Sequence, residues 1–168
     1  MLQCLSAADF QHILPLYRAC GAWLSANGFE NWGDFYPTEA IIRADLEAQN
    51  LFGWVVAAEL VGVVVVDEVA NPFYPQISWK YSQAKPAFVH RLAVHPAYQG
   101  KGYGQSLMLA AENTAQARKL EVLRLDVYEP NHALQRFYTL LGYENTGQSL
   151  HLGAPWVYGF VCFEKFIG

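Results

Sequence analysis

Apolar residues recur along the chain with two different periods, which predict a mixture of helices and strands. The first helical pattern follows one face of a helix through Phe10, Ile13, Leu14, Tyr17, Cys20 and Leu24. Before it, Ser6-Ala7-Ala8-Asp9 places an acid three positions after a serine, which is typical of a helix N-terminus. Pro15 lies inside the pattern and predicts a kink or a later start of the helix. Residues 1–5 predict an edge strand.

Three further helices are predicted. Thr38 is suited to cap a helix whose apolar positions are Ile41, Ile42 and Leu46. Residues 104–120 and 131–141 also carry apolar side chains at helical spacing. Gly142 follows the last of these helices at the position where glycine commonly ends a helix.

Apolar and β-branched stretches predict the strands. Residues 51–58 and 60–67 are two such stretches, and the short junction at 59–62 predicts a hairpin. Other strands are predicted at 87–94, 122–127, 143–150 and 157–166. Residues 28–37 predict a turn rich in aromatic rings, and residues 71–86, with three prolines, predict a loop.

The element order is β-α-α-β-β-β-α-β-α-β-β, which predicts an α/β (α+β) fold with a mixed sheet flanked by helices. A chain of 168 residues without repeats or linkers fits a single domain over residues 1–168.

Composition excludes several function classes. The formal net charge is −4 and no basic cluster occurs, which argues against nucleic-acid binding. The three cysteines lack metal-ligand spacing, so we expect no metal site and a reducing compartment. No signal peptide is evident, and the longest apolar run, residues 61–66, is too short for a membrane span. A cytoplasmic location without membrane partners is therefore expected.

One motif points to anion binding. Gln99-Gly100-Lys101-Gly102-Tyr103-Gly104, here called the glycine-rich turn, lies between a predicted strand and a predicted helix. Glycines expose backbone N–H groups, which can point at one anion at the positive end of a helix dipole. The spacing matches neither a Walker loop nor a dinucleotide fingerprint. The alternative is a flexible loop before a helix that begins with glycine.

The surrounding sequence supplies a resemblance. The stretch Leu92-Ala93-Val94-His95-Pro96-Ala97-Tyr98-Gln99-Gly100-Lys101-Gly102-Tyr103-Gly104 resembles the central motif of the GNAT acetyltransferase family. Downstream, Asn131-His132-Ala133-Leu134-Gln135-Arg136-Phe137-Tyr138-Thr139-Leu140-Leu141-Gly142-Tyr143 resembles the next motif of that family. The resemblance implies a mostly antiparallel sheet of six to seven strands, about four flanking helices and a splayed central strand pair. It also implies transfer of an acetyl group from acetyl-CoA to an amine.

Coenzyme-binding roles follow from the resemblance. The glycine-rich turn would hold the pyrophosphate through its backbone, and the strand residues Leu92, Ala93 and Val94 would pair with the pantetheine arm. From the facing helix, Asn131 would hydrogen-bond the arm, beside Ala133 and Phe137. Asn131 also has an ordinary alternative as a helix N-cap.

Three residues are candidates for the chemistry. The resemblance implies that the backbone N–H of Val94 polarises the thioester carbonyl and that Tyr138 is the general acid for the departing sulfur. The alternative for Tyr138 is a core tyrosine. His90 stands where many relatives carry a glutamate, and strand alternation puts it on one face with Leu92 and Val94. It is either a base or a packed histidine, and Arg91 on the opposite face is expected to pack or pair structurally.

The acceptor side is suggested by aromatic residues of the first turn and of the proline-containing loop: Phe29, Trp32, Phe35, Tyr36, Phe73, Tyr74 and Trp79. They could line a cleft for an apolar or cationic acceptor, or they could cover the core. Asp126 could bind substrate or belong to a structural ion pair.

The acceptor would be an amine of a small molecule or a peptide. Two other functions stay open, namely transfer of a different acyl group and non-catalytic binding of acyl-CoA. A nucleotide-binding protein is a third class, and a homodimer is compatible with the resemblance.

Overall fold

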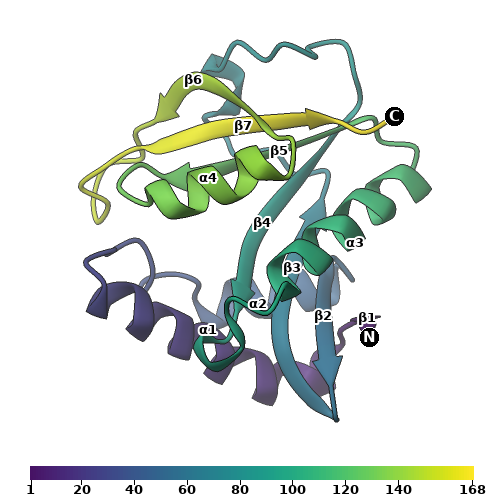
Figure 1. Cartoon of the computed structure of the whole chain (residues 1–168), viewed down its shortest axis with the longest axis vertical. Coiled ribbons are helices and arrows are strands. Elements are labelled where there is room, and N and C mark those ends of the chain that lie inside the picture. Colours follow the sequence, from purple (N-terminus) through teal and green to yellow (C-terminus); the bar gives the residue numbers. More distant parts are fainter. The chain divides into compact units, whose positions relative to one another are not determined.

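The computed structural model describes the whole chain, residues 1–168, as seven strands and four α-helices (Figure 1). The strands are β1 (Leu2–Cys4), β2 (Leu51–Val56), β3 (Glu59–Asp67), β4 (Pro86–Val94), β5 (Val122–Tyr128), β6 (Glu144–Leu150) and β7 (Phe160–Phe166). The helices are α1 (Phe10–Ala26), α2 (Glu39–Glu47), α3 (Tyr103–Ala117) and α4 (His132–Leu140). Short 3-10 turns occupy Ala7–Asp9, Tyr74–Gln76 and Pro96–Tyr98.

The seven strands form one mixed sheet in the order β1-β2-β3-β4-β5-β7-β6. The pairs β1–β2, β2–β3, β5–β7 and β6–β7 are antiparallel. Strands β4 and β5 are parallel, and Pro86 lies opposite Val122 in their register. The predicted fold class is thus confirmed, and β1 is an edge strand as expected.

The residues gather into two compact units. The first unit contains Met1–Val66 and Val89–Ala111, and the second contains Asp67–Phe88 and Glu112–Gly168. Strand β4 begins in the second unit and continues into the first, whereas α3 begins in the first and continues into the second. The expected single domain over residues 1–168 stays a prediction.

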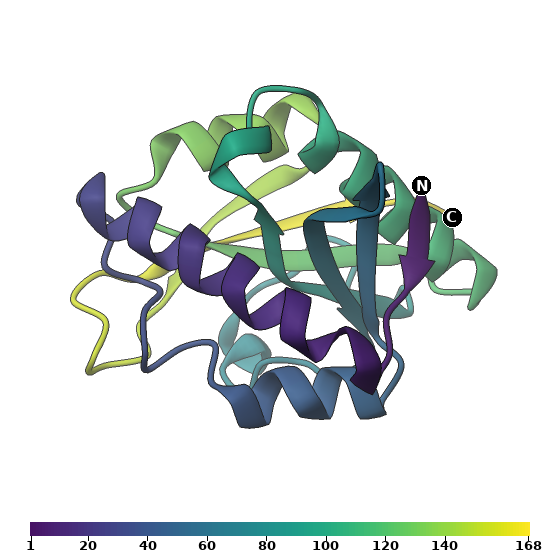
Figure 2. The same ribbon diagram turned by 90° about the horizontal axis from the view of Figure 1, so that it is seen from below.

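In the first unit, α1 and α2 contact each other, and Figure 2 shows the two helices at an angle to one another. The core under them is formed by side chains that are almost completely buried: Leu5, Ile13, Leu16, Tyr17, Cys20, Ile42, Leu46, Leu51, Val63, Val65 and Ala93. Each buried aliphatic side chain stabilises the fold by about 1.5–3 kcal/mol. The apolar residues that recur at helical spacing in the sequence are therefore the ones that α1 and α2 bury in this core.

Strand β3 is covered on both faces within the first unit. Val63 and Val65 belong to the core under α1 and α2. On the neighbouring position Gly62, an added Cβ would lie 2.9 Å from the carbonyl oxygen of Ala93 and 2.9 Å from Cδ1 of Leu107 in α3. A strand buried on both faces explains why the run is continuously apolar and does not alternate.

The hairpin turn between β2 and β3 lies at Ala57 and Ala58, and the predicted junction at 59–62 was wrong. Both alanines have positive φ, 49° and 66°, which is the conformation of a two-residue hairpin turn. Alanine gives no local signal for this turn. Gly62, inside the predicted junction, lies within β3, where its missing side chain serves close packing.

Helix α1 begins at Phe10, so the predicted later start at Pro15 was wrong. Pro15 lies inside the helix, and its burial-face neighbours Ile13, Leu16 and Tyr17 continue on both sides of it. Their packing outweighs the loss of one backbone hydrogen bond. The Ser6–Asp9 motif is confirmed, because the Ser6 N–H donates to the Asp9 carboxylate at 2.8 Å.

In the second unit, α4 lies over one face of β5 and β7 (Figure 1). Tyr138 of α4 packs against Phe163 of β7, with ring centroids 6.2 Å apart. Successive strand side chains point to opposite faces. Cys162 and Phe160 therefore face the other way, into an aromatic cluster formed by Tyr74, Ile77, Phe88, Tyr128, Leu150, Phe160 and Cys162, with Trp79, Leu152 and Trp156 against it.

Two buried charged side chains, Glu164 and Arg124, hold the proline-containing loop in place within the second unit. Glu164 of β7 is 1% exposed and accepts the backbone N–H of Lys80 at 2.5 Å. Arg124 of β5 lies 3.5 Å from Glu164, donates to the carbonyl of Tyr81 and stacks over the ring of Trp79. The segment is irregular in secondary structure, as predicted, and it is held in one place.

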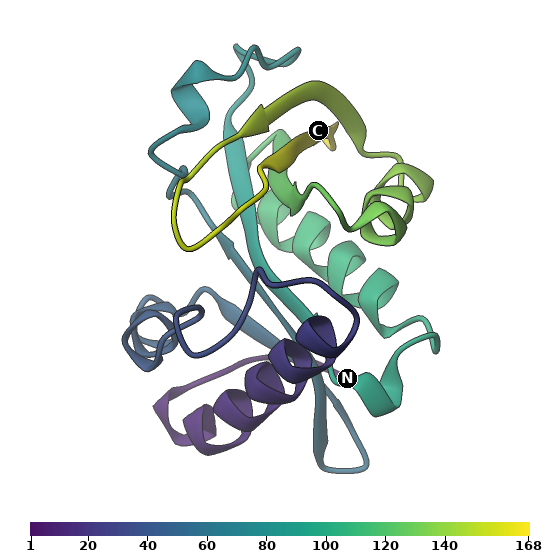
Figure 3. The ribbon, with the colours of Figure 1, turned by 90° about the vertical axis from the view of Figure 1, so that its left-hand side faces the viewer.

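The β2–β3 ribbon and helix α3 are seen from another side in Figure 3.

No helix has the length and apolar character needed to span a lipid bilayer. No group of three or more His, Cys, Asp or Glu side chains is arranged to hold a metal ion.

We predict that Gly62→Ala lowers the free energy of unfolding by about 1–3 kcal/mol, because its methyl group overlaps a backbone carbonyl that cannot move freely. Urea denaturation measures the change. The control is Gly21→Ala in α1, where the nearest atoms to an added Cβ lie at 3.7 Å. That variant should be stabilised by up to about 1 kcal/mol, since alanine favours helix. Equal midpoints for the two variants would contradict the close-packing role of Gly62.

Candidate active site

The glycine-rich turn connects the end of β4 to the start of α3 in the first unit. After Val94, the chain makes the 3-10 turn Pro96–Tyr98, and α3 begins at Tyr103. Gly100 and Gly102 have φ of 74° and 83°, in the left-handed region that favours glycine. An added Cβ at either position would meet no atom within 4 Å. These glycines are thus required by backbone conformation and leave the turn open.

Most backbone N–H groups of the turn make no hydrogen bond inside the protein, although the Gln99 N–H donates to the Pro96 carbonyl at 3.3 Å. No backbone hydrogen bond is made by the amides of Gly100, Lys101, Gly102, Tyr103 or Gly104. The first amides of a helix lack internal acceptors, and the helix dipole adds partial positive charge there. Several open donors therefore converge at the start of the 15-residue helix α3. Such a site suits phosphate oxygens.

The side chains around the turn support the backbone. Lys101 donates to the carbonyl of Ala97 at 3.0 Å and lies over the ring of Tyr98. Gln99 donates from its side chain to the carbonyl of Val94 at 3.2 Å. The anion-binding capacity of the turn thus belongs to the amides.

Val94 is anchored from two directions in the first unit. Its carbonyl accepts the Gln99 amide and also lies 3.4 Å from the thiol sulfur of Cys20 in α1. The next residue, His95, donates its backbone N–H to Val61 of β3 at 2.9 Å. The end of β4 is therefore held in a defined position where it enters the glycine-rich turn.

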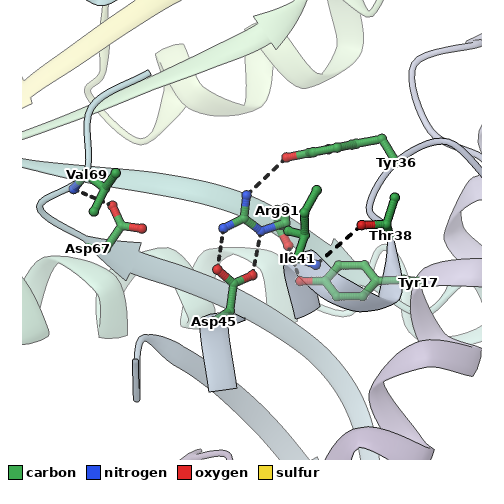
Figure 4. A network of polar contacts seen from close by, with 8 residues as sticks. All are labelled: Tyr17, Tyr36, Thr38, Ile41, Asp45, Asp67, Val69 and Arg91. Atoms are coloured by element: carbon green, nitrogen blue, oxygen red, sulfur yellow. Dashed lines mark hydrogen bonds and ion pairs between the residues drawn. The ribbon is translucent and has the colours of Figure 1, made fainter. Parts of the chain in front are cut away.

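A buried ion pair holds the middle of β4 (Figure 4). Arg91 donates from Nε to Oδ2 of Asp45 in α2 at 2.8 Å and from Nη2 to Oδ1 at 2.6 Å. Its Nη1 donates to the Tyr36 hydroxyl at 3.2 Å, and the Tyr17 hydroxyl donates to the Arg91 carbonyl at 3.1 Å. The side chains of Arg91 and Asp45 are only 11% and 10% exposed.

In this network Arg91 stays charged and Tyr17 stays neutral. Burial alone would lower the pKa of Arg91, but Tyr36 and Asp45 raise the pKa above its ordinary value. Burial raises the pKa of Tyr17, so its hydroxyl stays protonated and can donate. The expectation that Arg91 has a structural role agrees with these contacts.

Arg91 also has φ of 51°, an unusual value for a residue with a side chain. This conformation interrupts the regular alternation of β4 between His90 and Leu92. The predicted shared face of His90, Leu92 and Val94 assumed an unbroken strand, so that argument is corrected. His90 is half-buried, and its role as a base stays a prediction.

Two acceptor-side candidates of the first unit pack onto its core. Trp32 is half-buried and meets the ring of Tyr17 edge-on at 5.5 Å and that of Tyr36 at 6.4 Å. Tyr36 is also tied to Arg91 through its hydroxyl. Neighbouring Phe35 is 43% exposed. Trp32 therefore covers the core, whereas Phe35 faces solvent, and the acceptor role of these rings stays a prediction.

Tyr138 is the central candidate of the second unit. It is 4% exposed and is packed between the rings of Phe137, Tyr143 and Phe163. Its hydroxyl donates no hydrogen bond to another residue, in contrast to the hydroxyl of Tyr143, which contacts Glu112 at 3.2 Å. Burial, and then the negative charge of Asp126, raise the pKa of Tyr138 above its ordinary value. The phenol is a protonated donor at neutral pH.

Asn131 is the N-cap of α4, because its side-chain oxygen accepts the backbone N–H of Leu134 at 3.0 Å. The cap uses only the oxygen, and the side-chain amide hydrogens are still able to donate elsewhere. On the same helix, Ala133 is exposed and Phe137 is half-buried. The N-cap interpretation is confirmed, and the coenzyme role of Asn131 is compatible with it.

Two residues predicted separately for the acceptor are paired in the second unit. The Tyr74 hydroxyl donates to Oδ2 of Asp126 at 2.7 Å. Tyr74 is almost completely buried, and the half-buried Trp79 donates from its indole to the Tyr74 carbonyl at 3.2 Å. Sequence inspection singled out each residue but gave no sign of this pair.

Asp45 was missed from the sequence, although a signal was present. It stands three positions after Ile42 and directly before Leu46, on the apolar face of α2. An acid on such a face needs a buried partner. That requirement could have pointed to Arg91.

Comparison with known proteins identifies the family. Residues 15–143 match the family model described as "Acetyltransferase (GNAT) family". The chain belongs to the GNAT acetyltransferase family. An uncharacterized N-acetyltransferase of Bacillus subtilis, YesJ, is 26% identical over 161 residues, which cover 95% of this chain and 86% of that protein.

Solved structures show the same fold. A GNAT acetyltransferase of Streptococcus agalactiae superposes with a TM-score of 0.83 at 19% identity, covering 99% of this chain and 94% of the other. The PaiA N-acetyltransferase of Thermoplasma acidophilum, solved in complex with coenzyme A, gives a TM-score of 0.75 at 19% identity and covers 99% and 98%. The family match includes both the glycine-rich turn and α4, and the fold likeness extends through β6 and β7.

We predict that Asp45→Asn destabilises this GNAT protein by about 3–5 kcal/mol, because the variant leaves the Arg91 charge buried beside a neutral amide. Chemical denaturation measures the loss. The control is Asp34→Asn, which removes the partner of Arg18 at 3.1 Å from a fully exposed position. The control should unfold at the wild-type midpoint, since exposed ion pairs contribute little. If both variants unfold alike, the Arg91–Asp45 pair does not hold β4.

Proposed function

We propose that the protein is an acetyl-CoA-dependent N-acetyltransferase that moves the acetyl group directly to an amine of a small molecule or peptide. The observation that carries the proposal is the set of unbonded amides from Gly100 to Gly104 at the start of α3, in a chain of the GNAT family. The open geometry at Gly100 and Gly102 fits a pyrophosphate, and PaiA, a structural relative, binds coenzyme A.

The coenzyme-binding roles are assigned as follows. Gln99 to Gly104 hold the pyrophosphate through the backbone, and the backbone of Leu92, Ala93 and Val94 pairs with the pantetheine arm. Asn131 donates from its amide to the same arm, beside Ala133 and Phe137. Acetyl-CoA supplies an activated acetyl group, and no metal is required by this chemistry.

In the reaction, one C–N bond forms and one C–S bond breaks. The nitrogen loses a proton and the sulfur gains one. The backbone N–H of Val94 donates to the carbonyl oxygen, and one such donor contributes roughly 3 kcal/mol to transition-state stabilisation. His90, directly or through water, is the candidate acceptor of the nitrogen proton.

Tyr138 donates to the departing sulfur. The raised pKa of Tyr138 keeps the phenol protonated, but it also makes full proton transfer to a thiolate more uphill. The main contribution of Tyr138 is therefore a hydrogen bond that stabilises negative charge on sulfur as the C–S bond breaks. Solvent can then supply the proton of the free thiol.

We predict that the wild-type protein releases free CoA from acetyl-CoA when a suitable amine is present, as measured with a thiol reagent across an amine library. Tyr138→Phe should lower kcat by about 10²–10³-fold, the usual loss for one donor to developing charge, while the Kd for CoA changes by less than about threefold. Tyr143→Phe, which removes another buried phenol, is the control and should retain wild-type kcat.

Equal losses of kcat and CoA affinity in Tyr138→Phe would contradict the proposed hydrogen bond from Tyr138 to the departing sulfur. Tight CoA binding without turnover toward any amine would favour a non-catalytic acyl-CoA-binding module. Release of CoA only from longer acyl-CoA donors would favour another acyl group.

We predict that Gly102→Ala weakens CoA binding by about tenfold or more, because its methyl group enters the open face of the turn and left-handed φ is unfavourable for alanine. Isothermal titration with CoA measures Kd. The control is Gly28→Ala, which has nearly the same φ, 82°, and the same open surroundings outside the turn. Similar Kd values for the two variants would argue against pyrophosphate binding at the turn.

A further inference from the structure

The connection between β4 and the glycine-rich turn is bonded to the start of β3 at two points in the first unit. The backbone N–H of His95 donates to the carbonyl of Val61 at 2.9 Å. The Tyr98 hydroxyl donates to the carboxylate of Glu59, the first residue of β3, at 2.5 Å. The segment from His95 to Tyr98 is therefore held at both of its ends by the same strand.

The segment between these two points also bonds within itself. The Tyr98 N–H donates to the His95 carbonyl at 2.8 Å, and the Ala97 N–H donates to Nδ1 of His95 at 3.3 Å. The rings of His95 and Tyr98 meet edge-on at 6.0 Å. Because the segment is compact, the position of Tyr98 determines where the next residue, Gln99, begins the glycine-rich turn.

The ring of Tyr98 contacts the two side chains of the glycine-rich turn that lie beyond Gln99. Nζ of Lys101 lies 4.9 Å from the Tyr98 ring centroid, and the ring of Tyr103 meets the Tyr98 ring edge-on at 6.2 Å. Tyr98 is half-buried and Glu59 is exposed. The hydrogen bond to Glu59 therefore fixes a ring against which the turn packs.

The glycines of the turn contribute no packing of their own. Gly100 and Gly102 have left-handed φ, and an added Cβ at either position would meet no atom within 4 Å. Glycine loses more conformational freedom on ordering than any other residue. The order of the turn thus depends on its flanks, which are α3 on one side and Tyr98 on the other.

The contact between Tyr98 and Glu59 is of a strong kind. A hydroxyl that donates to a carboxylate forms a charge-assisted hydrogen bond, which is shorter and stronger than a neutral one. The bond to Glu59 also raises the pKa of Tyr98, so the phenol is a donor at neutral pH. It joins residues that are 39 positions apart in the chain.

We propose that Glu59 and Tyr98 are positioning residues for the coenzyme, because their hydrogen bond fixes the glycine-rich turn relative to β3 and preorganises its open amides for a pyrophosphate. The assignment rests on the proposed acetyl-CoA-dependent function and adds two residues to its donor side. A preorganised site loses less conformational freedom on binding, so its affinity for the ligand is higher. Neither side chain has to touch the coenzyme.

The charge of Glu59 distinguishes this positioning role from simple electrostatics. A carboxylate near the turn repels a pyrophosphate, so charge alone predicts that removal of the carboxylate tightens CoA binding. Positioning predicts the opposite sign. Measurement at about 1 M salt, where the Debye length is about 3 Å, suppresses the repulsion and leaves the positioning effect.

The first test is isothermal titration with CoA. Glu59→Ala and Tyr98→Phe should each raise Kd by about 5- to 10-fold, because each variant removes the charge-assisted bond. Glu59→Gln keeps a neutral acceptor of the same size and should lose less. The double variant Glu59→Ala/Tyr98→Phe should stay within about twofold of the larger single loss, since both changes act through one contact.

Glu47→Ala is the matched control for the change of charge. It removes an exposed carboxylate from the last residue of α2, in the same unit as Glu59. The control should bind CoA with the wild-type Kd.

A second test separates positioning of the turn from general damage to the protein. Acetyl-pantetheine has the thioester and the pantetheine arm of acetyl-CoA but lacks the pyrophosphate. With acetyl-CoA as donor, Glu59→Ala and Tyr98→Phe should raise KM by about 5- to 10-fold at unchanged kcat. With acetyl-pantetheine as donor, kcat/KM should change by less than about twofold.

Tighter or unchanged CoA binding in Glu59→Ala and Tyr98→Phe would overturn the positioning role. Additive losses in the double variant, or equal losses with the two donors, would overturn it as well. In each of these cases the proposed function stands if the wild-type protein releases CoA in the presence of an amine. A wild-type protein that binds no CoA would overturn both.

Discussion

The ion pair between Arg91 and Asp45 is the contact on which the geometry of β4 depends. Arg91 adopts a left-handed conformation that costs about 1–3 kcal/mol for a residue with a side chain. It persists because α2 holds the guanidinium through Asp45 and α1 holds the carbonyl through Tyr17. The strand then continues through Val94 into the glycine-rich turn, so the helices of the first unit determine how the proposed coenzyme-binding backbone is presented.

In the proposed function, backbone groups bind the coenzyme and side chains supply the remaining functional groups. In the glycine-rich turn the open amides are the binding groups, and Lys101 is turned back to Ala97. In the second unit the functional candidates are side chains whose properties come from burial. Tyr138 is kept protonated by its apolar surroundings, and Asp126 is oriented by Tyr74 among aromatic rings.

Local patterns predicted the elements well where propensity and packing agree. The cap at Asn131, the apolar face of α1 and the loop with three prolines are all found as predicted. Predictions failed where packing competes with local preference. Pro15 remains inside α1 because its neighbours are buried, and the hairpin turns at Ala57 and Ala58 instead of the predicted junction at 59–62. Neither outcome can be read from short-range spacing.

The sequence by itself determined the fold class, the family resemblance and the glycine-rich turn, because these depend on residue type and order along a short stretch of chain. Only the tertiary structure decided which distant residues meet. The pairs Arg91 with Asp45 and Tyr74 with Asp126 are 46 and 52 positions apart, and no local period links their members. The pKa of Tyr138 likewise follows from burial and a neighbouring charge, which exist only once the chain has folded.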